Sequence, residues 1–210
     1  MDKIVERHRR YLPHIQLEGQ IISLTWRLAF SLPRPVLLLW EALKKNPAEV
    51  RLSPEARPGG HSAEYLQKLG EYDDALGRLK PERVNLCAEE IGIMLGKAFR
   101  FYDGELYELH CFCVMPNHVH ILLRPLRGST GTYHLDSDIV RRLKSYTAKR
   151  INALLGRQGE LWQPDYFDRF IRDPEDYFTV VRYILENPVK AGLARNPEQW
   201  RQAYYRPGLI

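Results

Sequence analysis

Two histidines, His118 and His120, flank one hydrophobic residue in a run of strand-forming residues. Alternate side chains of a β-strand share one face, so both imidazoles are expected to project together while Val119 and Ile121 face the core. Two imidazoles held on one rigid strand can supply half of a metal site. Histidines with ordinary packing and hydrogen-bonding roles are the alternative, because this spacing alone is not specific.

Two cysteines on the preceding strand-like run offer a different metal site. If residues 116–117 form a tight turn, Cys113 would pair across from His120, and Cys111 would lie on the same face. With His118 these side chains would make a Cys₂His₂ set for zinc. The spacing is not that of a zinc finger, and a single hairpin does not readily surround a tetrahedral ion. A zinc-binding module is therefore the weaker hypothesis.

The residues around the histidines resemble a known nuclease motif. Residues 115–123 (MPNHVHILL) closely match the motif of the HUH endonucleases, two histidines around a hydrophobic residue, in the version found in single-tyrosine transposases. A histidine-triad nucleotide hydrolase would need a third histidine where Leu122 stands. Further matches occur at residues 10–14, 144–148, 162, 167–169 and 183–193. Together these segments resemble the REP-associated tyrosine transposases across most of the chain.

The resemblance implies a specific chemistry. Tyr183 would be the nucleophile, and His118, His120 and Asn187 would hold a divalent metal ion, Mg²⁺ or Mn²⁺. The implied reaction is metal-dependent cleavage and rejoining of single-stranded DNA hairpins, formed by repetitive palindromic elements, through a covalent 5′-phosphotyrosine intermediate. This reaction is DNA transposition. A catalytically silent hairpin-DNA-binding protein is the alternative, although the four intact residues argue against it.

The choice of tyrosine is also supported by spacing. Tyr183 and Asn187 are four residues apart in a run predicted to be helical, so they would share one helix face. A metal ligand one turn from the hydroxyl would hold that oxygen beside the phosphate. Tyr146 is the runner-up, because it lies among basic residues but has no carboxamide or carboxylate one turn away. Asn187 also suits the end of a helix ahead of Pro188, where it would act as a cap.

Positive charge is concentrated in the second half of the chain. The formal net charge is +5 at pH 7 and the pI is about 9.1, a balance compatible with a polyanionic partner but also common in proteins that bind no nucleic acid. Trp162 and Tyr166 are candidates for stacking on unpaired DNA bases. The basic candidates for contacts with DNA are Arg124, Lys144, Lys149, Arg150, Arg169, Arg182 and Lys190.

Hydrophobic periodicity and turn residues predict mixed strands and helices. Strands are expected at residues 20–28, 99–102, 106–115, 118–124 and 166–172, and helices within 36–80 and at 83–99, 137–156 and 173–187. Without a regular alternation of strand and helix, the class is α+β. The resemblance implies a ferredoxin-like antiparallel sheet flanked by helices, with extra helices inserted in the N-terminal half. Residues 34–80, the helical insertion, match no motif and have no assigned role.

The composition predicts one packed domain over residues 1–210. Hydrophobic residues make up 44% of the chain and charged residues 27%, values typical of folded globular domains. The longest uncharged apolar run, residues 36–40, is too short to span a bilayer, and three cysteines suit a reducing compartment. A cytoplasmic, nucleoid-associated location is expected. The sequence leaves open whether a monomer or a homodimer is active.

Overall fold

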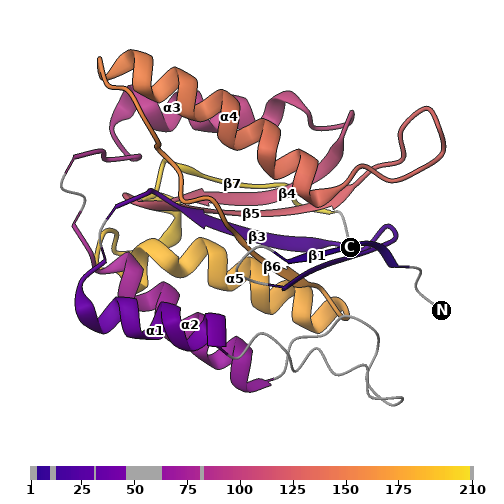
Figure 1. The fold of residues 1–210 in the computed structure, drawn as a ribbon, viewed down its shortest axis with the longest axis horizontal. Helices are drawn as coiled ribbons and strands as arrows, with labels where there is room; N and C mark the ends of the chain where they lie inside the picture. Colours follow the sequence, from indigo (N-terminus) through magenta and orange to yellow (C-terminus); the bar gives the residue numbers. More distant parts are fainter. Residues whose placement is uncertain (1–3, 10–12, 31, 46–62, 81–82, 209–210) are drawn as a thin grey trace.

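The computed structural model describes residues 4–9, 13–30, 32–45, 63–80 and 83–208 (Figure 1). The strands are β1 (Ile4–Arg9), β2 (Pro13–Leu17), β3 (Ile22–Arg27), β4 (Tyr107–Val114), β5 (His118–Pro125), β6 (Phe167–Phe170) and β7 (Ala203–Tyr205). The helices are α1 (Arg34–Lys45), α2 (Ala63–Gly77), α3 (Glu89–Phe101), α4 (Asp136–Leu154), α5 (Pro174–Lys190) and the short 3₁₀ helix η1 (Pro197–Gln199). Within these described residues, no helix is long and apolar enough to cross a membrane.

Five strands form one antiparallel sheet in the order β6-β3-β5-β4-β7. Along the chain, β3, α3, β4, β5, α4 and β6 make a βαββαβ unit, and their strands lie in the sheet in the ferredoxin-like order, which β7 extends beyond β4. β1 and β2 pair with each other in a separate sheet. The expected α+β class and ferredoxin-like sheet are confirmed, and α1 and α2 are the extra helices of the N-terminal half.

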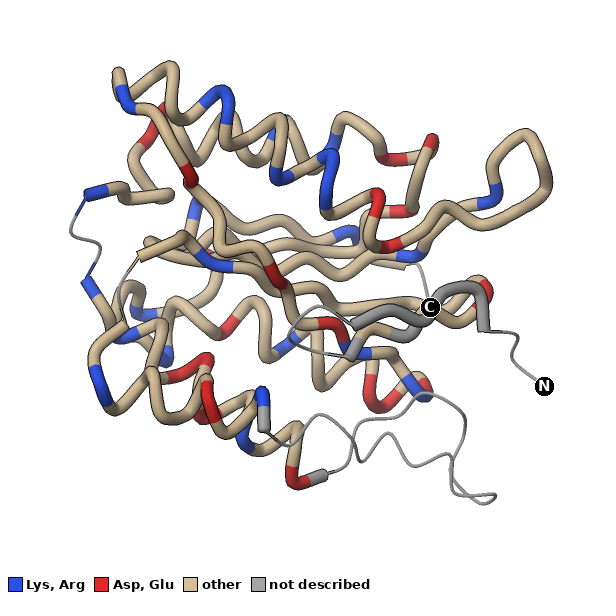
Figure 2. The backbone as a smooth tube through the Cα atoms, viewed as in Figure 1, with Lys and Arg blue, Asp and Glu red and all other residues tan. Residues whose placement is uncertain are grey.

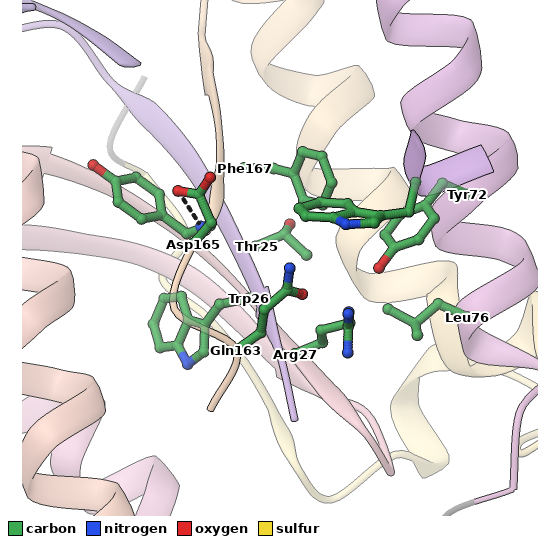
Figure 3. A pocket seen from close by; sticks show the side chains of 10 residues that line it. Thr25, Trp26, Arg27, Tyr72, Leu76, Gln163, Asp165 and Phe167 are labelled. Atoms are coloured by element: carbon green, nitrogen blue, oxygen red, sulfur yellow. Dashed lines mark hydrogen bonds between the residues drawn. The ribbon is translucent and has the colours of Figure 1, made fainter. Parts of the chain in front are cut away.

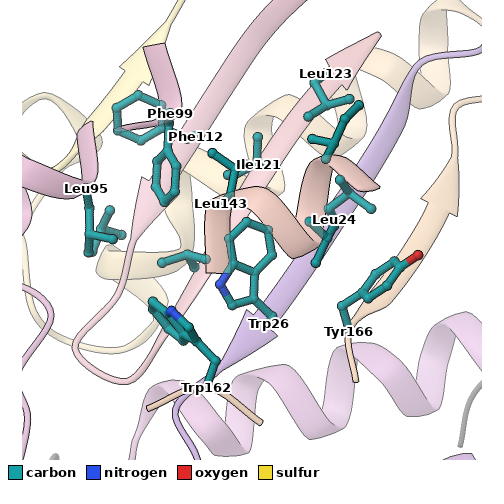
Figure 4. Packing of buried hydrophobic residues seen from close by; sticks show 14 of the residues in the cluster. Leu24, Trp26, Leu95, Phe99, Phe112, Ile121, Leu123, Leu143, Trp162 and Tyr166 are labelled. Carbon is teal, nitrogen blue, oxygen red and sulfur yellow. The ribbon is translucent and has the colours of Figure 1, made fainter. Parts of the chain in front are cut away.

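The helices form two layers, with α3 and α4 on one face of the sheet and α1, α2 and α5 on the other (Figure 1). Strand alternation sends Trp26, Val119 and Ile121 to the α3–α4 side, where they join the largest buried cluster (Figure 4). There the Trp26 ring packs edge-on against Phe99 and Trp162, with centroid separations of 6.1 and 6.2 Å. The alternate residues of β5 therefore face α2 and α5.

The expected strand at residues 99–102 and the expected start of the helix at residue 83 both differ in the structure. Residues 99–101 end α3 instead of forming a strand, so β4 and β5 alone build the central hairpin. α3 begins at Glu89 and not near residue 83, because the preceding backbone and side chains have other partners. The Leu86 N–H donates to the Pro116 carbonyl, and the Cys87 thiol donates to the Val114 carbonyl. These bonds fix the segment against the β4–β5 turn.

A buried charged cluster fixes the N-terminal strand pair to the sheet. In β2, His14 places Nδ1 2.7 Å from Asp168 Oδ1 and Nε2 2.9 Å from Asp165 Oδ1, and its ring stacks on Tyr166. Burial alone would lower the pKa of His14, but the hydrogen bonds and charges of the two carboxylates outweigh it and raise the pKa to about 9. Tyr166 is thus buried in this cluster, as Trp162 is in the core, so neither is exposed for stacking on DNA bases.

This cluster makes stability depend on pH. Because the pKa of His14 rises from 6.5 to about 9 on folding, its contribution is fully present below about pH 6.5 and is lost as the pH rises through about 9. A shift of this size corresponds to about 3 kcal/mol. Between about pH 6.5 and about pH 10, we expect the melting temperature of the wild type to fall by several degrees more than that of His14→Gln. Parallel pH curves in thermal unfolding would contradict this role.

Candidate active site

His118 and His120 begin β5, a central strand that pairs with both β3 and β4. Their Nε2 atoms are 3.0 Å apart, and both side chains are buried. Neighbours hold the outer nitrogens: His118 Nδ1 is 2.6 Å from Asn117 Oδ1, and His120 Nδ1 is 2.9 Å from Thr25 Oγ1. Because Asn117 Oδ1 can only accept, His118 Nδ1 carries the proton and its Nε2 keeps a lone pair for a ligand.

Asn117 also ties the histidines to α2. Its Nδ2 donates to the backbone carbonyls of Leu76 and Leu79, at 2.9 and 3.2 Å, where α2 ends. One buried side chain therefore orients His118 and anchors the end of a helix that comes from the insertion.

α2 adds Asp73, a residue that was not singled out from the sequence. Its Oδ1 lies 3.5 Å from His118 Nε2, and its Oδ2 lies 3.4 Å from His120 Nε2. The three side chains offer ligand atoms that all lie within 4.8 Å of one another. Asp73 Oδ1 is buried and has no hydrogen-bond partner among the described residues. Residues 34–80, where no motif was recognised, thus contribute a carboxylate to the site.

Tyr183 and Asn187 reach the same carboxylate from α5. The Tyr183 hydroxyl donates to Asp73 Oδ2, and Asn187 Nδ2 donates to the same oxygen at 3.1 Å. Asn187 Nδ2 also lies 3.2 Å from His120 Nε2. The four residues singled out from the sequence therefore meet in one buried place, with Asp73 at its centre.

The end of α5 differs from expectation. The helix continues through Pro188 to Lys190, and the Ala191 N–H donates to the Asn187 carbonyl at 3.0 Å. Asn187 therefore lies inside the helix, and the alternative that it is the helix cap is wrong. The added turn brings Lys190 Nζ to 4.4 Å from the centre of the Tyr183 ring.

Burial determines the charges of the site. It lowers the pKa of His118 to about 3 and also lowers that of His120, so both imidazoles are neutral at neutral pH. Burial opposes ionisation of Asp73, but the hydrogen bonds from Tyr183 and Asn187 favour its carboxylate form, and the pKa of Asp73 lies below its usual range. Burial, followed by the Asp73 charge, raises the pKa of Tyr183 well above its ordinary value. The site presents two neutral nitrogens, a carboxylate and a protonated phenol.

These groups fit a divalent cation. Neutral imidazoles and an ionised carboxylate are the forms in which such side chains bind metals, and here they are already grouped. Asp73 Oδ1 is buried without a hydrogen-bond partner among the described residues, so its lone pairs are available to a metal ion. Turning the Asn187 amide over would exchange its nitrogen and oxygen and present the oxygen to the same place.

Comparison with known proteins identifies the family. The family model described as "Transposase IS200 like" matches residues 82–187, half of the chain. The chain belongs to this family. The matched range contains His118, His120, Tyr183 and Asn187. It begins at residue 82, so Asp73 lies outside it.

Two curated relatives of this chain are both named as REP-associated tyrosine transposases. It is 28% identical to the putative REP-associated tyrosine transposase of Haemophilus influenzae over 100 residues, 45% of this chain and 56% of that protein. It is 29% identical to the REP-associated tyrosine transposase of Escherichia coli over 122 residues, 58% of this chain and 68% of that protein. The chain thus spans little more than half the length of the first relative. The resemblance to REP-associated tyrosine transposases is confirmed.

A solved structure of a REP-associated tyrosine transposase bound to a REP hairpin is a distant structural neighbour. It aligns with 95% of this chain and 82% of its own, with a TM-score of 0.48 and 18% identity. At this distance, residues of the two chains are not equated.

The basic residues expected to contact DNA have different surroundings. Arg182 and Lys190 are exposed on α5, on either side of Tyr183 in the chain. Two others are ion-paired: Arg169 with Asp176, and Arg124 with Glu108 at 3.6 Å. Arg182 and Lys190 thus combine exposure with a place on the helix that carries Tyr183.

The candidates on α4 lie on one side of the sheet, whereas the side chains of His118 and His120 point to the other side. Lys149 and Arg150 are exposed there, and Figure 2 shows Lys and Arg spaced along α4. Lys144 instead donates to three backbone carbonyls of residues 163–165, at 2.7, 3.3 and 2.8 Å, and so fixes a loop. Tyr146, the runner-up nucleophile, is 52% exposed on this helix, so the sheet separates it from the metal donors.

The zinc alternative is not supported. Cys113 does pair with His120 across the hairpin, as that alternative required. However, Cys111 and Cys113 are both buried, and burial raises the pKa of both thiols above the ordinary value. In the part of the chain that the structure describes, the one group of metal donors consists of Asp73 and the two histidines.

Proposed function

We propose that this chain cleaves and rejoins single-stranded DNA folded into hairpins, with Tyr183 as the nucleophile and a divalent metal ion as the cofactor. The observation that carries the proposal is the convergence of the Tyr183 hydroxyl and both histidine Nε2 atoms on one carboxylate, Asp73. Membership of a transposase family and the names of two relatives support DNA as the substrate. The protein would work on DNA in the cytoplasm, at the nucleoid.

The metal would be held by His118, His120, Asp73 and Asn187. Mixed imidazole and oxygen ligands with open positions suit Mn²⁺ or Mg²⁺. When bound, such an ion polarises a nonbridging phosphate oxygen and neutralises the charge that develops during the displacement.

The chain's own residues position the attacking oxygen. α5 directs the Tyr183 hydroxyl into the site, and Asp73 holds it there and is the nearest acceptor for its proton. Attack forms a bond between the tyrosine oxygen and phosphorus and breaks the bond from phosphorus to the 3′ oxygen, which takes up a proton. The products are a 5′-phosphotyrosine link and a free 3′-hydroxyl.

The covalent link makes the reaction reversible. It conserves the energy of the broken phosphodiester, so a 3′-hydroxyl can attack it and rejoin DNA without ATP. Arg182 and Lys190 are proposed to contact backbone phosphates beside Tyr183, since both are exposed on the same helix. Strand cleavage followed by rejoining to another end is DNA transposition.

A covalent label tests this function. The wild type would be incubated with labelled single-stranded hairpin DNA and Mn²⁺ or Mg²⁺, and denaturing gels would report label that stays on the protein. We expect an adduct that forms with metal, is prevented by EDTA and accompanies a shortened strand with a 3′-hydroxyl. Binding of the same hairpins without any adduct would instead identify a catalytically silent binder.

A further inference from the structure

A cleft of about 900 Å³ opens at the end of the sheet where the chain leaves β3. Its walls are residues 27–30 and 32–33, residues 79–80 at the end of α2, residues 83–84 before α3, and residues between 157 and 164 that follow α4. These segments meet at the left edge of Figure 1. The cleft lies beside the candidate active site, because Arg27 pairs with His118 in the sheet and the Leu28 N–H donates to the Asn117 carbonyl at 2.8 Å.

The cleft is lined with positive charge. Lys80 and Arg83 are exposed at its rim and Arg157 is partly exposed, whereas Glu160 is the acidic residue among the lining residues. These cations come from separate segments that converge on one concave surface. Such an arrangement concentrates positive potential and attracts an anion of extended shape.

Arg27 lines the cleft as a buried cation and is 8% exposed. Its Nη1 donates to the Leu28 and Phe30 carbonyls at 2.8 and 3.4 Å, while its Nε is buried with no hydrogen-bond partner among the described residues. The guanidinium lies 5.4 and 5.9 Å from the centres of the Phe30 and Trp40 rings. Figure 3 draws a neighbouring pocket, in which Arg27 lies beside Gln163; both residues also line the cleft. Carbonyls and rings do not neutralise a buried guanidinium, so an anion in the cleft would stabilise it.

We infer that this cleft binds the sugar–phosphate backbone of an unpaired DNA segment, with Arg27 contacting a phosphate inside it and Lys80 and Arg83 at its rim. The inference rests on the proposed function, because it assigns a place to that function's substrate. The volume of about 900 Å³ suits a few unpaired nucleotides. The cleft and the candidate active site are adjacent, because Arg27, which lines the cleft, pairs with His118 across neighbouring strands.

The test measures affinity without cleavage. Fluorescence anisotropy in EDTA would compare two probes, an oligothymidine that forms no hairpin and a duplex. The rim variant is Lys80→Gln with Arg83→Gln. The matched control is Lys97→Gln with Arg201→Gln, which removes the same charge from exposed residues outside the cleft.

We expect the rim variant to bind oligothymidine about tenfold more weakly than the control, with a salt dependence smaller by about one to two released ions. Arg27→Gln, checked for folding by its melting temperature, is expected to weaken binding at least as much. Equal affinities of the rim variant and the control would overturn the inference, as would an equal loss with the duplex probe.

The covalent adduct of the wild type separates this inference from the proposed function. If the adduct forms while the rim variant binds oligothymidine normally, the cleft assignment fails and the function stands. If the rim variant loses affinity while the wild type forms no adduct with any hairpin, the cleft assignment stands and the function fails.

Discussion

Tyr183→Phe is expected to abolish the covalent adduct, lowering its rate of formation by on the order of a thousandfold or more. The substitution removes the one oxygen that Asp73 holds and leaves the ring in its place on α5. Asn187 still donates to Asp73 in the variant, so the remaining donors keep their arrangement. Label transfer from single-stranded hairpin DNA, measured as a time course, gives the two rates.

Tyr146→Phe is the matched control for this prediction. It makes the same chemical change on an exposed residue of α4, on the other side of the sheet, and is expected to leave the rate of adduct formation unchanged. An adduct that survives Tyr183→Phe and disappears in Tyr146→Phe would move the nucleophile to α4 and overturn the site described above.

Asp73→Asn is expected to weaken Mn²⁺ binding by about 10- to 100-fold. Asparagine has nearly the same shape and can still accept a hydrogen bond from Tyr183, so the loss reports the missing negative charge among neutral donors. Titration calorimetry with Mn²⁺ measures the affinity. Thermal unfolding gives a second readout, because a metal at about 100 times its dissociation constant stabilises the wild type by about 2.7 kcal/mol, and the variant would lose about 1.3 to 2.3 kcal/mol of that gain.

Glu71→Gln provides the comparison for Asp73→Asn. Glu71 is exposed on the same helix, two residues away, and its change also converts an acid into an amide. It is expected to bind Mn²⁺ as the wild type does. If Asp73→Asn bound Mn²⁺ with the affinity of Glu71→Gln, the carboxylate would have no part in the metal site.

Local patterns in the sequence were enough to place the histidines and the tyrosine. Strand alternation put His118 and His120 on one face, and helical spacing put Tyr183 and Asn187 on another, because both relations depend only on residues near each other in the chain. Asp73 could not be placed in this way, since it bonds to a residue 110 positions later.

A weaker signal did mark Asp73. In α2 it stands at helical spacing from the apolar Leu69 and Leu76, and so occupies a core-facing position where an acid is unusual. The sequence alone does not say what such an acid meets. Its partners come from β5 and α5, and they are defined by the tertiary fold.

The basic residues show the same limit. Lys144 was predicted to contact DNA because it is a cation on a basic helix. In the structure its ammonium group donates hydrogen bonds to three backbone carbonyls of a later loop. Arg169 similarly donates to Asp176. Charge is visible in the sequence, whereas its neutralisation by partners from other elements is not, so Arg182 and Lys190 remain predictions that rest on their exposure beside Tyr183.

The most direct measurement locates the DNA-derived mass on the protein. After the adduct is trimmed with nuclease, trypsin cleavage after Arg182 and Lys190 releases residues 183–190, which contain one tyrosine, Tyr183; the corresponding peptide for Tyr146 is residues 145–149. The account predicts that the nucleotide mass lies on residues 183–190 and on no other peptide. Nucleotide mass on residues 145–149, or on any other peptide, would contradict it.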